Sequence, residues 1–357
     1  MKVIQIDKSE LEAGLGKLEK AFRLIGPVKE KGYHLFKTLD SGQKPDLDYM
    51  NTRLSARSIL YPQSEVMFEF SLDKADEQYA ILREPEKDSQ PRAVIGIRPC
   101  DADAYAVVRR NFDTPEYKDP YWLKNFEATT LVGLACSTPC PTCFCTSAVS
   151  GPFSDKNLDI MLVDNGDHYL ARIATEKGEK LAADAGWQRP AEGAENRIED
   201  LKLAAEEKIQ SEISTDNLAN QSLNDLYEAE AAIWEPEAFA CINCGTCTHA
   251  CPTCWCFDVQ DETYGKSGFR MRNWDSCMYP LFSLHASGHN PRGTKTARVR
   301  QRFMHKLKYY VDKFEQGIQC TGCGRCVRLC PVNIDIRRIC NKMNSYDPET
   351  CSCAVTS

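Results

Sequence analysis

Two stretches of this 357-residue chain share one cysteine pattern: Cys241-Ile-Asn-Cys244-Gly-Thr-Cys247-Thr-His-Ala-Cys251-Pro252 and Cys320-Thr-Gly-Cys323-Gly-Arg-Cys326-Val-Arg-Leu-Cys330-Pro331. Each reads C-x2-C-x2-C-x3-C-P. Three thiolates on one tight loop can reach three irons of a cubane, and the glycine inside each loop lets the backbone turn close to the inorganic sulfides. The pattern is typical of a ferredoxin domain that holds two [4Fe–4S] clusters.

The fourth cysteine of each run is expected to bind the cluster of the other run, as it does in ferredoxins with two clusters. This rule gives the first cluster the ligands Cys241, Cys244, Cys247 and Cys330. It gives the second cluster the ligands Cys320, Cys323, Cys326 and Cys251. Zinc fits less well, because a structural zinc ion takes four ligands, generally as two separated pairs, and not two full runs each closed by a proline.

The chain holds 19 cysteines, an odd number that cannot pair completely into disulfides within one molecule. Disulfide scaffolds are usually short secreted chains, whereas this chain is long enough to bury a core without them. Its first residues lack the basic stretch and apolar run of a signal peptide, and no window approaches eighteen consecutive apolar residues. We therefore expect a cytoplasmic protein without a membrane span, whose clustered thiols serve metal or redox chemistry.

Charge is distributed unevenly along the chain, although the net charge is only −7. Residues 192–237 hold 13 acidic and 3 basic side chains, whereas residues 266–313 hold 11 basic and 2 acidic ones. The basic stretch lies between the two cysteine runs, where it could raise the potential of anionic clusters or bind an acidic partner. The alternative is a solvated helix over 296–313 with one basic face. The overall acidity and the lack of a helix-turn-helix signal argue against a nucleic-acid partner.

The first part of the chain has the pattern of mixed helices and strands. Apolar residues at helical spacing predict helices over 11–24 and 101–110. Short apolar or alternating runs predict strands over 66–70, 93–97, 129–135, 158–163 and 169–173. A strand followed by a helix, repeated, favours a partly parallel sheet. The predicted fold is an α/β or α+β N-terminal domain, followed by an α-helical dicluster ferredoxin-type [4Fe–4S] domain with a long insert between its two cysteine runs.

A third group of cysteines lies in this N-terminal part. Cys100 and Cys136 each follow an apolar strand, and if these strands are parallel neighbours both thiols lie at the sheet edge where α/β proteins bind ligands. We predict a third [4Fe–4S] cluster on Cys100, Cys136, Cys143 and Cys145, with Cys140 as the spare thiol. One alternative is a group of inert buried thiols. A radical-SAM cluster loop is the other, but the long barrel that follows such a loop is missing.

These features divide the chain into four parts. We expect residues 1–190 to form the α/β domain with the extra cysteine site. Residues 191–236 should form an acidic helical connector, with helices over 197–213 and 222–234. The dicluster ferredoxin-type domain is expected over 237–345. Residues 346–357 are expected to be a flexible tail that contains Cys351 and Cys353.

Further motifs give the chain a resemblance to a known family over most of its length. They are Tyr61-Pro62 with Glu65, Arg98-Pro99-Cys100-Asp101, Cys136 with Cys143-Phe144-Cys145, Cys251-Pro252-Thr253-Cys254-Trp255-Cys256, Trp274-Asp275-Ser276-Cys277, Gly288-His289-Asn290-Pro291-Arg292, and Arg300-Gln301-Arg302 with His305-Lys306. In these the chain resembles the iron–sulfur subunit shared by anaerobic sulfite reductase (its A subunit) and cytoplasmic sulfhydrogenase-type [NiFe] hydrogenases (their beta subunit). Related subunits accompany heterodisulfide-reductase-like flavin oxidoreductase complexes.

The resemblance implies a non-catalytic electron-transfer subunit of an anaerobic oxidoreductase complex. It would relay single electrons between an FAD- and NAD(P)-binding reductase subunit and a catalytic subunit, which could be a sulfite reductase, a [NiFe] hydrogenase or a heterodisulfide-reductase-like module. The family accounts for two clusters, and the third is inferred from the residues alone. Cys254, Cys256 and Cys277 match the family but receive no derived role, and Cys340 matches nothing in its pattern.

The alternative function is that of a stand-alone iron–sulfur oxidoreductase. Such an enzyme would use the N-terminal domain to hold a substrate or a flavin. No G-x-G-x-x-G sequence and no phosphate-binding loop supports this hypothesis.

Overall fold

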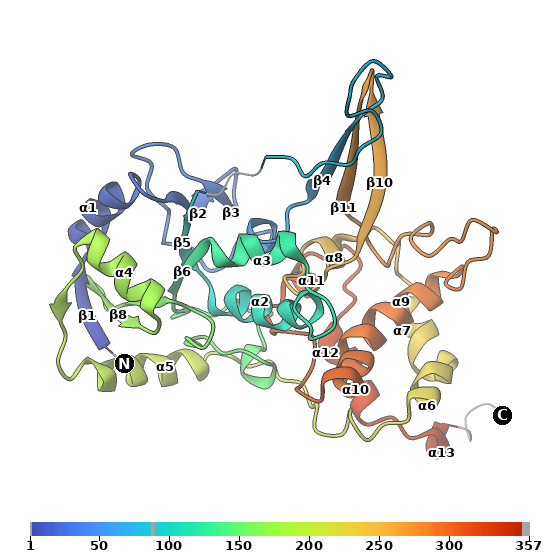
Figure 1. The fold of residues 1–357 in the computed structure, drawn as a ribbon. Helices are drawn as coiled ribbons and strands as arrows, with labels where there is room; N and C mark the ends of the chain where they lie inside the picture. The colour runs from blue at the N-terminus through green and yellow to red at the C-terminus, as the bar shows by residue number, and fades with distance from the viewer. Residues whose placement is uncertain (1, 87–89, 352–357) are drawn as a thin grey trace.

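The computed structural model of the chain describes residues 2–86 and 90–351, and its larger sheet has eight strands (Figure 1). These strands are β1 (Lys2–Asp7), β2 (Arg23–Lys29), β3 (His34–Thr38), β5 (Arg92–Ile97), β6 (Thr129–Leu134), β7 (Ile160–Asp164), β8 (His168–Ile173) and β9 (Arg189–Pro190). Their order is β3-β2-β5-β6-β7-β8-β1-β9. The central strands β2, β5, β6 and β7 are parallel neighbours, and the outer pairs are antiparallel. The prediction of a partly parallel sheet is confirmed.

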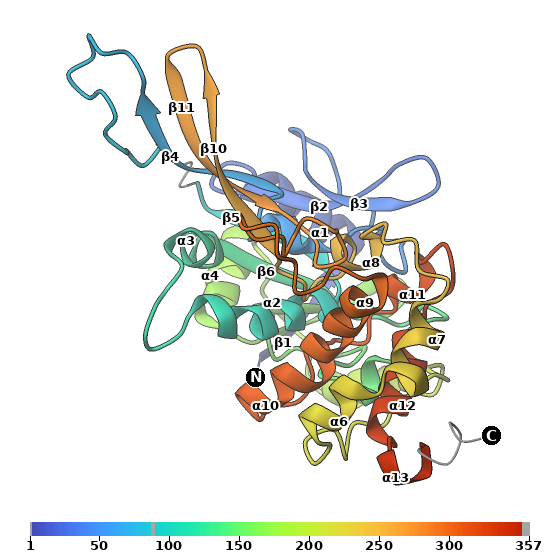
Figure 2. The ribbon, with the colours of Figure 1, turned by 90° about the vertical axis from the view of Figure 1, so that its right-hand side faces the viewer.

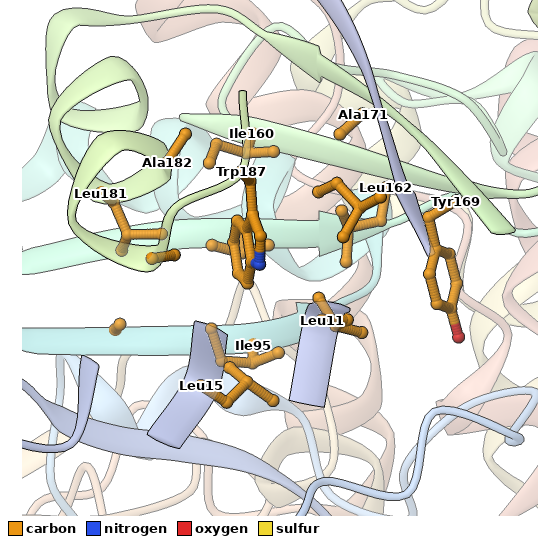
Figure 3. Close-up of a cluster of buried hydrophobic side chains, with 14 of the residues drawn as sticks. Leu11, Leu15, Ile95, Ile160, Leu162, Tyr169, Ala171, Leu181, Ala182 and Trp187 are labelled. Carbon is orange, nitrogen blue, oxygen red and sulfur yellow. The ribbon is translucent and has the colours of Figure 1, made fainter. Parts of the chain in front are cut away.

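Helices cover both faces of this sheet because its central strands are apolar on both sides. Helices α1 (Lys8–Leu18) and α4 (Glu176–Ala185) pack on one face, where Ile95 and Leu162 meet Trp187 (Figure 3). The other face is covered by α2 (Pro99–Phe112), α3 (Pro120–Glu127) and α5 (Ala194–Glu206). Neighbouring residues of a strand point to opposite faces, so Val94 belongs to the second core and Ile95 to the first.

Most of the N-terminal elements agree with the sequence-based prediction. The strands expected over 93–97, 129–135, 158–163 and 169–173 and the helix over 101–110 correspond to β5, β6, β7, β8 and α2. The helix expected over 11–24 was wrong beyond Leu18, because Leu24 lies in β2. That strand continues through Gly26 and Pro27, which do not suit a helix, and pairs in parallel with β5. The helix expected over 197–213 ends at Glu206.

A second sheet joins distant parts of the chain. Its strands are β4 (Ser64–Ser71), β10 (Phe257–Tyr264) and β11 (Ser267–Trp274), in the order β10-β11-β4. All eight residues of β10 are exposed, and the hairpin projects from the molecule in both views (Figures 1 and 2). The prediction of a purely α-helical C-terminal domain was therefore wrong in its insert. The buried Arg272 of β11 pairs with Glu65 of β4 and with Asp119 ahead of α3.

The remaining elements are short helices, most of which surround a third core, while the first of them packs in the second core. They are η1 (Ala56–Ile59), η2 (Cys145–Ser147), α6 (Leu223–Glu228), η3 (Glu230–Trp234), α7 (Glu235–Ala238), α8 (Thr246–His249), α9 (Lys295–Met304), η4 (His305–Tyr309), α10 (Tyr310–Phe314), α11 (Arg325–Arg328), α12 (Ile336–Asn344) and α13 (Pro348–Cys351). The core includes Trp234, Phe303, Leu307, Ile339 and Met343. The segments η3 and η4 are π-helical, and η4 joins α9 to α10.

The basic helix between the cysteine runs is not solvated, contrary to one of the two interpretations of its sequence. Its basic residues Arg298, Arg300, Arg302, Lys306 and Lys308 are all buried. Burial of so many charges requires partners inside the protein. Arg300 pairs with Glu230 and Lys308 pairs with Asp312. Arg302 and Lys306 instead line the cavities of the candidate sites.

The end of the described chain is helical, since α13 reaches Cys351. Cys353 and the rest of the predicted tail lie outside the described residues. Within residues 2–86 and 90–351, none of the helices has the length and apolar character needed to cross a membrane.

Candidate metal centres

Thiols from both cysteine runs surround a first cavity. Its cysteines are Cys241, Cys244, Cys247 and Cys330. Cys241 and Cys244 lie in the loop that leads into α8, Cys247 lies in α8 itself, and Cys330 lies just beyond α11. Apolar residues of α9 and of the chain after Cys330 form the other walls, among them Val299, Phe303 and Ile334. Cys244 is exposed, so this first site reaches the protein surface.

A second cavity lies deeper in the protein. Its cysteines are Cys251, Cys320, Cys323 and Cys326, and Phe144 and Ile336 complete its apolar walls. Burial raises the pKa of Cys323 to about 12. A free thiol with this pKa would stay protonated at neutral pH, whereas a metal-bound thiol is deprotonated. The structure thus brings together the two crossed sets of four cysteines that the ferredoxin pattern predicts, and their role as ligands remains a proposal.

The spacing of the thiols suits clusters better than single ions. Across the described ranges 2–86 and 90–351, no three His, Cys, Asp or Glu side chains converge closely enough to hold one metal ion. Zinc binds thiolate sulfur at about 2.3 Å, so its four ligands must meet around one point. A cubane instead offers each thiolate a different iron. Two sets of four thiols around separate cavities fit two [4Fe–4S] clusters.

Buried cations provide a second test of this fit. Arg302 lines the first cavity and Lys306 the second, and they are 4% and 2% exposed. Lys306 Nζ donates to Thr253 Oγ1 (2.8 Å) and to the Gln319 carbonyl (3.2 Å), while Arg302 Nε is buried without an acceptor. In the part of the chain that the structure describes, neither forms an ion pair with a carboxylate. A buried charge needs a counter-charge, and an anionic cluster would supply one.

Arg57 is a third such cation, and no sequence motif pointed to it. It is buried, and its Nη1 atom donates to the carbonyls of Thr248 (3.3 Å) and Cys254. Its guanidinium group lies 3.4 Å from the centre of the Trp274 ring. This role could not be predicted from the sequence, because Arg57 lies almost 200 residues away from the residues that it contacts.

The third group of cysteines gathers at the carboxyl edge of the larger sheet. Strands β5 and β6 are parallel neighbours, so Cys100 and Cys136 leave the sheet at the same edge. Burial raises the pKa of Cys136 to about 11. Arg98 opposes this shift, and the thiols of Cys140 and Cys143 add to it. The Sγ atoms of Cys143 and Cys145 are 3.4 Å apart, and the hydrogen bond from Cys145 lowers the pKa of Cys143 to about 7.

The third group packs directly on the second cysteine run. The Phe144 amide donates to the Gly322 carbonyl (2.9 Å). Gly322 and Gly324 have φ values of 66° and 68°. A Cβ atom at Gly322 would lie 2.6 Å from the Cys145 backbone, and one at Gly324 would lie 2.3 Å from the Thr142 carbonyl oxygen. These two positions therefore need glycine both for their conformation and for the close approach of the two loops.

A buried ion pair holds the second and third groups together. Arg325 and Asp101 are 0% and 1% exposed. Arg325 Nη1 donates to Asp101 Oδ1 (2.5 Å), Nη2 donates to Oδ2 (2.7 Å), and Nε donates to the Thr52 carbonyl (3.0 Å). Arg325 also lowers the pKa of both Cys323 and Cys100 against the larger effect of burial. One guanidinium group thus acts on a thiol of each group.

The remaining cysteines fall into two classes. Cys254, Cys256 and Cys277 share one cavity with Trp255 and His305. Cys340 is fully buried in the third core, where its Sγ atom lies 3.5 Å from the Ser214 carbonyl oxygen. Cys340 is therefore a packing residue of the core, whereas the other three thiols line a cavity that could hold a ligand.

A larger cavity of about 970 Å³ adjoins the third group. It opens at the carboxyl edge of the sheet, and Tyr49, Arg53, Arg98 and Arg328 are among the residues that line it. Ser137 and Thr138, next to Cys136, form part of its wall. The sequence did not reveal this cavity, because its walls come from loops that are far apart in the chain.

We expect Arg325→Met to lower the stability of the anaerobically purified protein by about 3–5 kcal/mol, since it leaves the Asp101 carboxylate buried and unpaired. Denaturant unfolding of the wild type and the variant measures this difference. Adding Asp101→Leu to Arg325→Met should recover part of the loss. Arg270→Met is the control, because Arg270 forms an exposed pair with Asp261 and its loss should change little. Equal effects of Arg325→Met and Arg270→Met would contradict the importance of the buried pair.

Comparisons with known proteins agree with this geometry. Residues 240–334 match the family model of the 4Fe-4S dicluster domain. This segment includes both cysteine runs, from Cys241 to Cys330.

The similarity to one known protein extends over almost the whole chain. The sulfhydrogenase 2 subunit beta of Pyrococcus furiosus is 28% identical over 340 residues, which cover 94% of this chain and 96% of that protein. No solved structure matches the chain. The resemblance inferred from the sequence is therefore confirmed: the chain is similar over almost its whole length to a sulfhydrogenase beta subunit, and its C-terminal part holds a 4Fe-4S dicluster domain.

Proposed function

We propose that this chain is an electron-transfer subunit of a multi-subunit anaerobic oxidoreductase. Its relative is named as a subunit of a sulfhydrogenase, so a role inside a larger complex is the natural one. The observation that carries the proposal is the pair of four-thiol cavities walled by Arg302 and Lys306, two buried cations for which the described residues provide no carboxylate. The partners would be an FAD- and NAD(P)-binding reductase subunit and a catalytic module, either a sulfite reductase, a [NiFe] hydrogenase or a heterodisulfide-reductase-like module.

When bound, [4Fe–4S] clusters supply reversible one-electron transfer. The first set of thiolates would be Cys241, Cys244, Cys247 and Cys330. The second would be Cys251, Cys320, Cys323 and Cys326. Arg302 and Lys306 favour the more negative, reduced state of whatever the thiolates hold, and the apolar walls exclude water. The chain needs no general acid or base for this function.

The first site is suited to contact with a partner. Cys244 is exposed, and Phe239 and Ile242 beside this cysteine run are 84% and 63% exposed. Large apolar residues at the surface around a redox site are typical of a protein–protein contact. We therefore place the docking surface of one partner subunit around Phe239 and Ile242. The basic helix is an unsuitable docking surface for an acidic partner, because most of its basic side chains, from Arg298 to Lys308, are buried.

The third site, with Cys100, Cys136, Cys143 and Cys145, belongs to the same proposal. Its loop packs against the second run, and Cys100 and Cys323 are close enough to affect each other's charge state. A third [4Fe–4S] cluster at this position would lie next to the second site.

A second candidate function is that of a stand-alone oxidoreductase that binds a substrate or a flavin in its N-terminal domain. The cavity of about 970 Å³ beside the third site favours it, since ligands of α/β proteins bind at this edge of the sheet. The arginines in its wall would suit an anionic ligand.

Iron analysis tests the third site. We expect Cys136→Ser to lose about four irons per chain relative to the wild type, because a cubane that lacks one of its ligands is released or degraded. Iron and sulfide are measured on protein that is prepared and kept without oxygen. Cys340→Ser is the matched control, since Cys340 is a fully buried thiol whose Sγ atom lies 3.5 Å from the Ser214 carbonyl oxygen. Unchanged iron in Cys136→Ser would exclude Cys136 as a cluster ligand.

Redox titration separates the two candidate functions. We expect the isolated chain to be bleached in the visible range by dithionite, and to remain oxidised with NADH or NADPH until a flavin-containing reductase subunit is added. The physical reason is that the iron–sulfur sites accept single electrons, whereas a nicotinamide donates a hydride. Rapid reduction of the isolated chain by NADPH would favour the stand-alone oxidoreductase.

Substitution at the surface tests the docking site. We expect Ile242→Glu to weaken the electron-transferring complex with a purified partner subunit by about tenfold, because it places a charge at the centre of an apolar contact. Titration of the rate of cluster reduction against partner concentration gives the affinity. Leu203→Glu is the control, since Leu203 is 51% exposed on α5, away from the cysteine runs. The same affinity in both variants would show that the docking surface does not include Ile242.

A further inference from the structure

The hairpin β10–β11 brings three unassigned cysteines together. Cys254 and Cys256 come just before β10, and Cys277 comes just after β11. Because Phe257 pairs with Trp274 at the base of the hairpin, the two flanking segments must meet, and the Asp275 amide donates to the Cys256 carbonyl (3.0 Å). All three cysteines line a single cavity.

The walls of this cavity resemble those of the two ferredoxin sites. Arg302, which lines the first cavity, and Lys306, which lines the second, both line this one. Trp255 Nε1 and Arg302 Nε, both from residues that line the cavity, are buried donors without an acceptor. Buried N–H groups normally have partners, and the sulfides of a cluster accept hydrogen bonds.

His305 also lines the cavity and could complete a set of four ligands. It is the first residue of η4, and its ring packs edge-on against Trp255, with the ring centres 5.9 Å apart. No hydrogen bond of the His305 side chain exists among the residues that the structure describes. A neutral imidazole can replace a thiolate on an iron of a cluster, as it does in Rieske centres.

We propose that Cys254, Cys256 and Cys277 bind a further iron–sulfur cluster, with His305 as its fourth ligand. A cluster is favoured over a single ion, because no three metal-binding side chains of the described ranges converge on one point. The site lies next to the second ferredoxin cavity, since Lys306 lines both cavities. Its use rests on the proposed electron-transfer function: it would accept one electron from the second site, which is thereby oxidised, with no bond formed or broken.

Iron content is the first test, and it does not depend on any partner subunit. Cys277→Ser and Cys256→Ser, purified as the full chain without oxygen, should each lose about two irons if the cluster is [2Fe–2S] and about four if it is a cubane. Either loss, with the other clusters retained by electron paramagnetic resonance, supports the site. Cys340→Ser should keep the full content. Wild-type iron and sulfide content in Cys277→Ser would overturn the proposal, even if the chain still exchanged electrons with its partners.

The second test uses the intact protein and does not require a cysteine variant to fold. The reduced wild-type protein should show a strong nitrogen hyperfine coupling from the imidazole of His305 in pulsed electron paramagnetic resonance. The coupling should vanish in His305→Cys, where a thiolate replaces the imidazole, while the iron content stays at the wild-type level. His249→Phe is the control, because the His249 ring is bound to the Tyr279 hydroxyl (3.1 Å). A coupling that persists in His305→Cys, or that is absent from the wild type, would rule out His305 as the ligand.

Discussion

Arg57, Arg302 and Lys306 bring positive charge into the interior of this protein, and none of the three meets a carboxylate in the described part of the chain. Such charges would be very costly in an interior that offered only carbonyls and hydroxyls. Their position among cysteine thiols explains why they are tolerated, because thiolates and sulfide-containing clusters are anionic. A cluster bound at these sites would thus contribute to the folding free energy of this domain, as metals do in other metal-dependent domains.

The second cavity is the junction of the proposed sites. Cys326 affects the charge state of Cys247 in the first site, and Cys323 does the same for Cys100 in the third. Lys306 lines both this cavity and the cavity of the proposed further site. In a linear chain of clusters, electrons would enter at one end and leave at the other. This arrangement instead gives the central site three neighbours, which suits a subunit that sits between several redox partners.

Local patterns were predictable from the sequence, and distant contacts were not. The cysteine runs, β5, β6 and α2 depend on residues that are close in the chain, so spacing and periodicity were sufficient. The strand β10 escaped prediction because all of its residues are exposed and no apolar alternation marks it. The basic helix was ambiguous because a lysine that faces an anionic site and one that faces water follow the same spacing. Arg57 and the cavity beside the third site depend on segments that meet only in the folded protein.

The ion pair between Arg325 and Asp101 joins the two halves of the chain. Asp101 lies in the first turn of the helix that follows β5, and Arg325 lies inside the second cysteine run. Gly322 and Gly324 allow the loop of Cys143 and Cys145 to touch the same run, and β4 of the N-terminal half completes the sheet of the hairpin. The carboxyl edge of a parallel sheet usually serves a small ligand. Here the same edge also positions thiols against a ferredoxin loop, so the α/β half forms a wall of the candidate cluster sites.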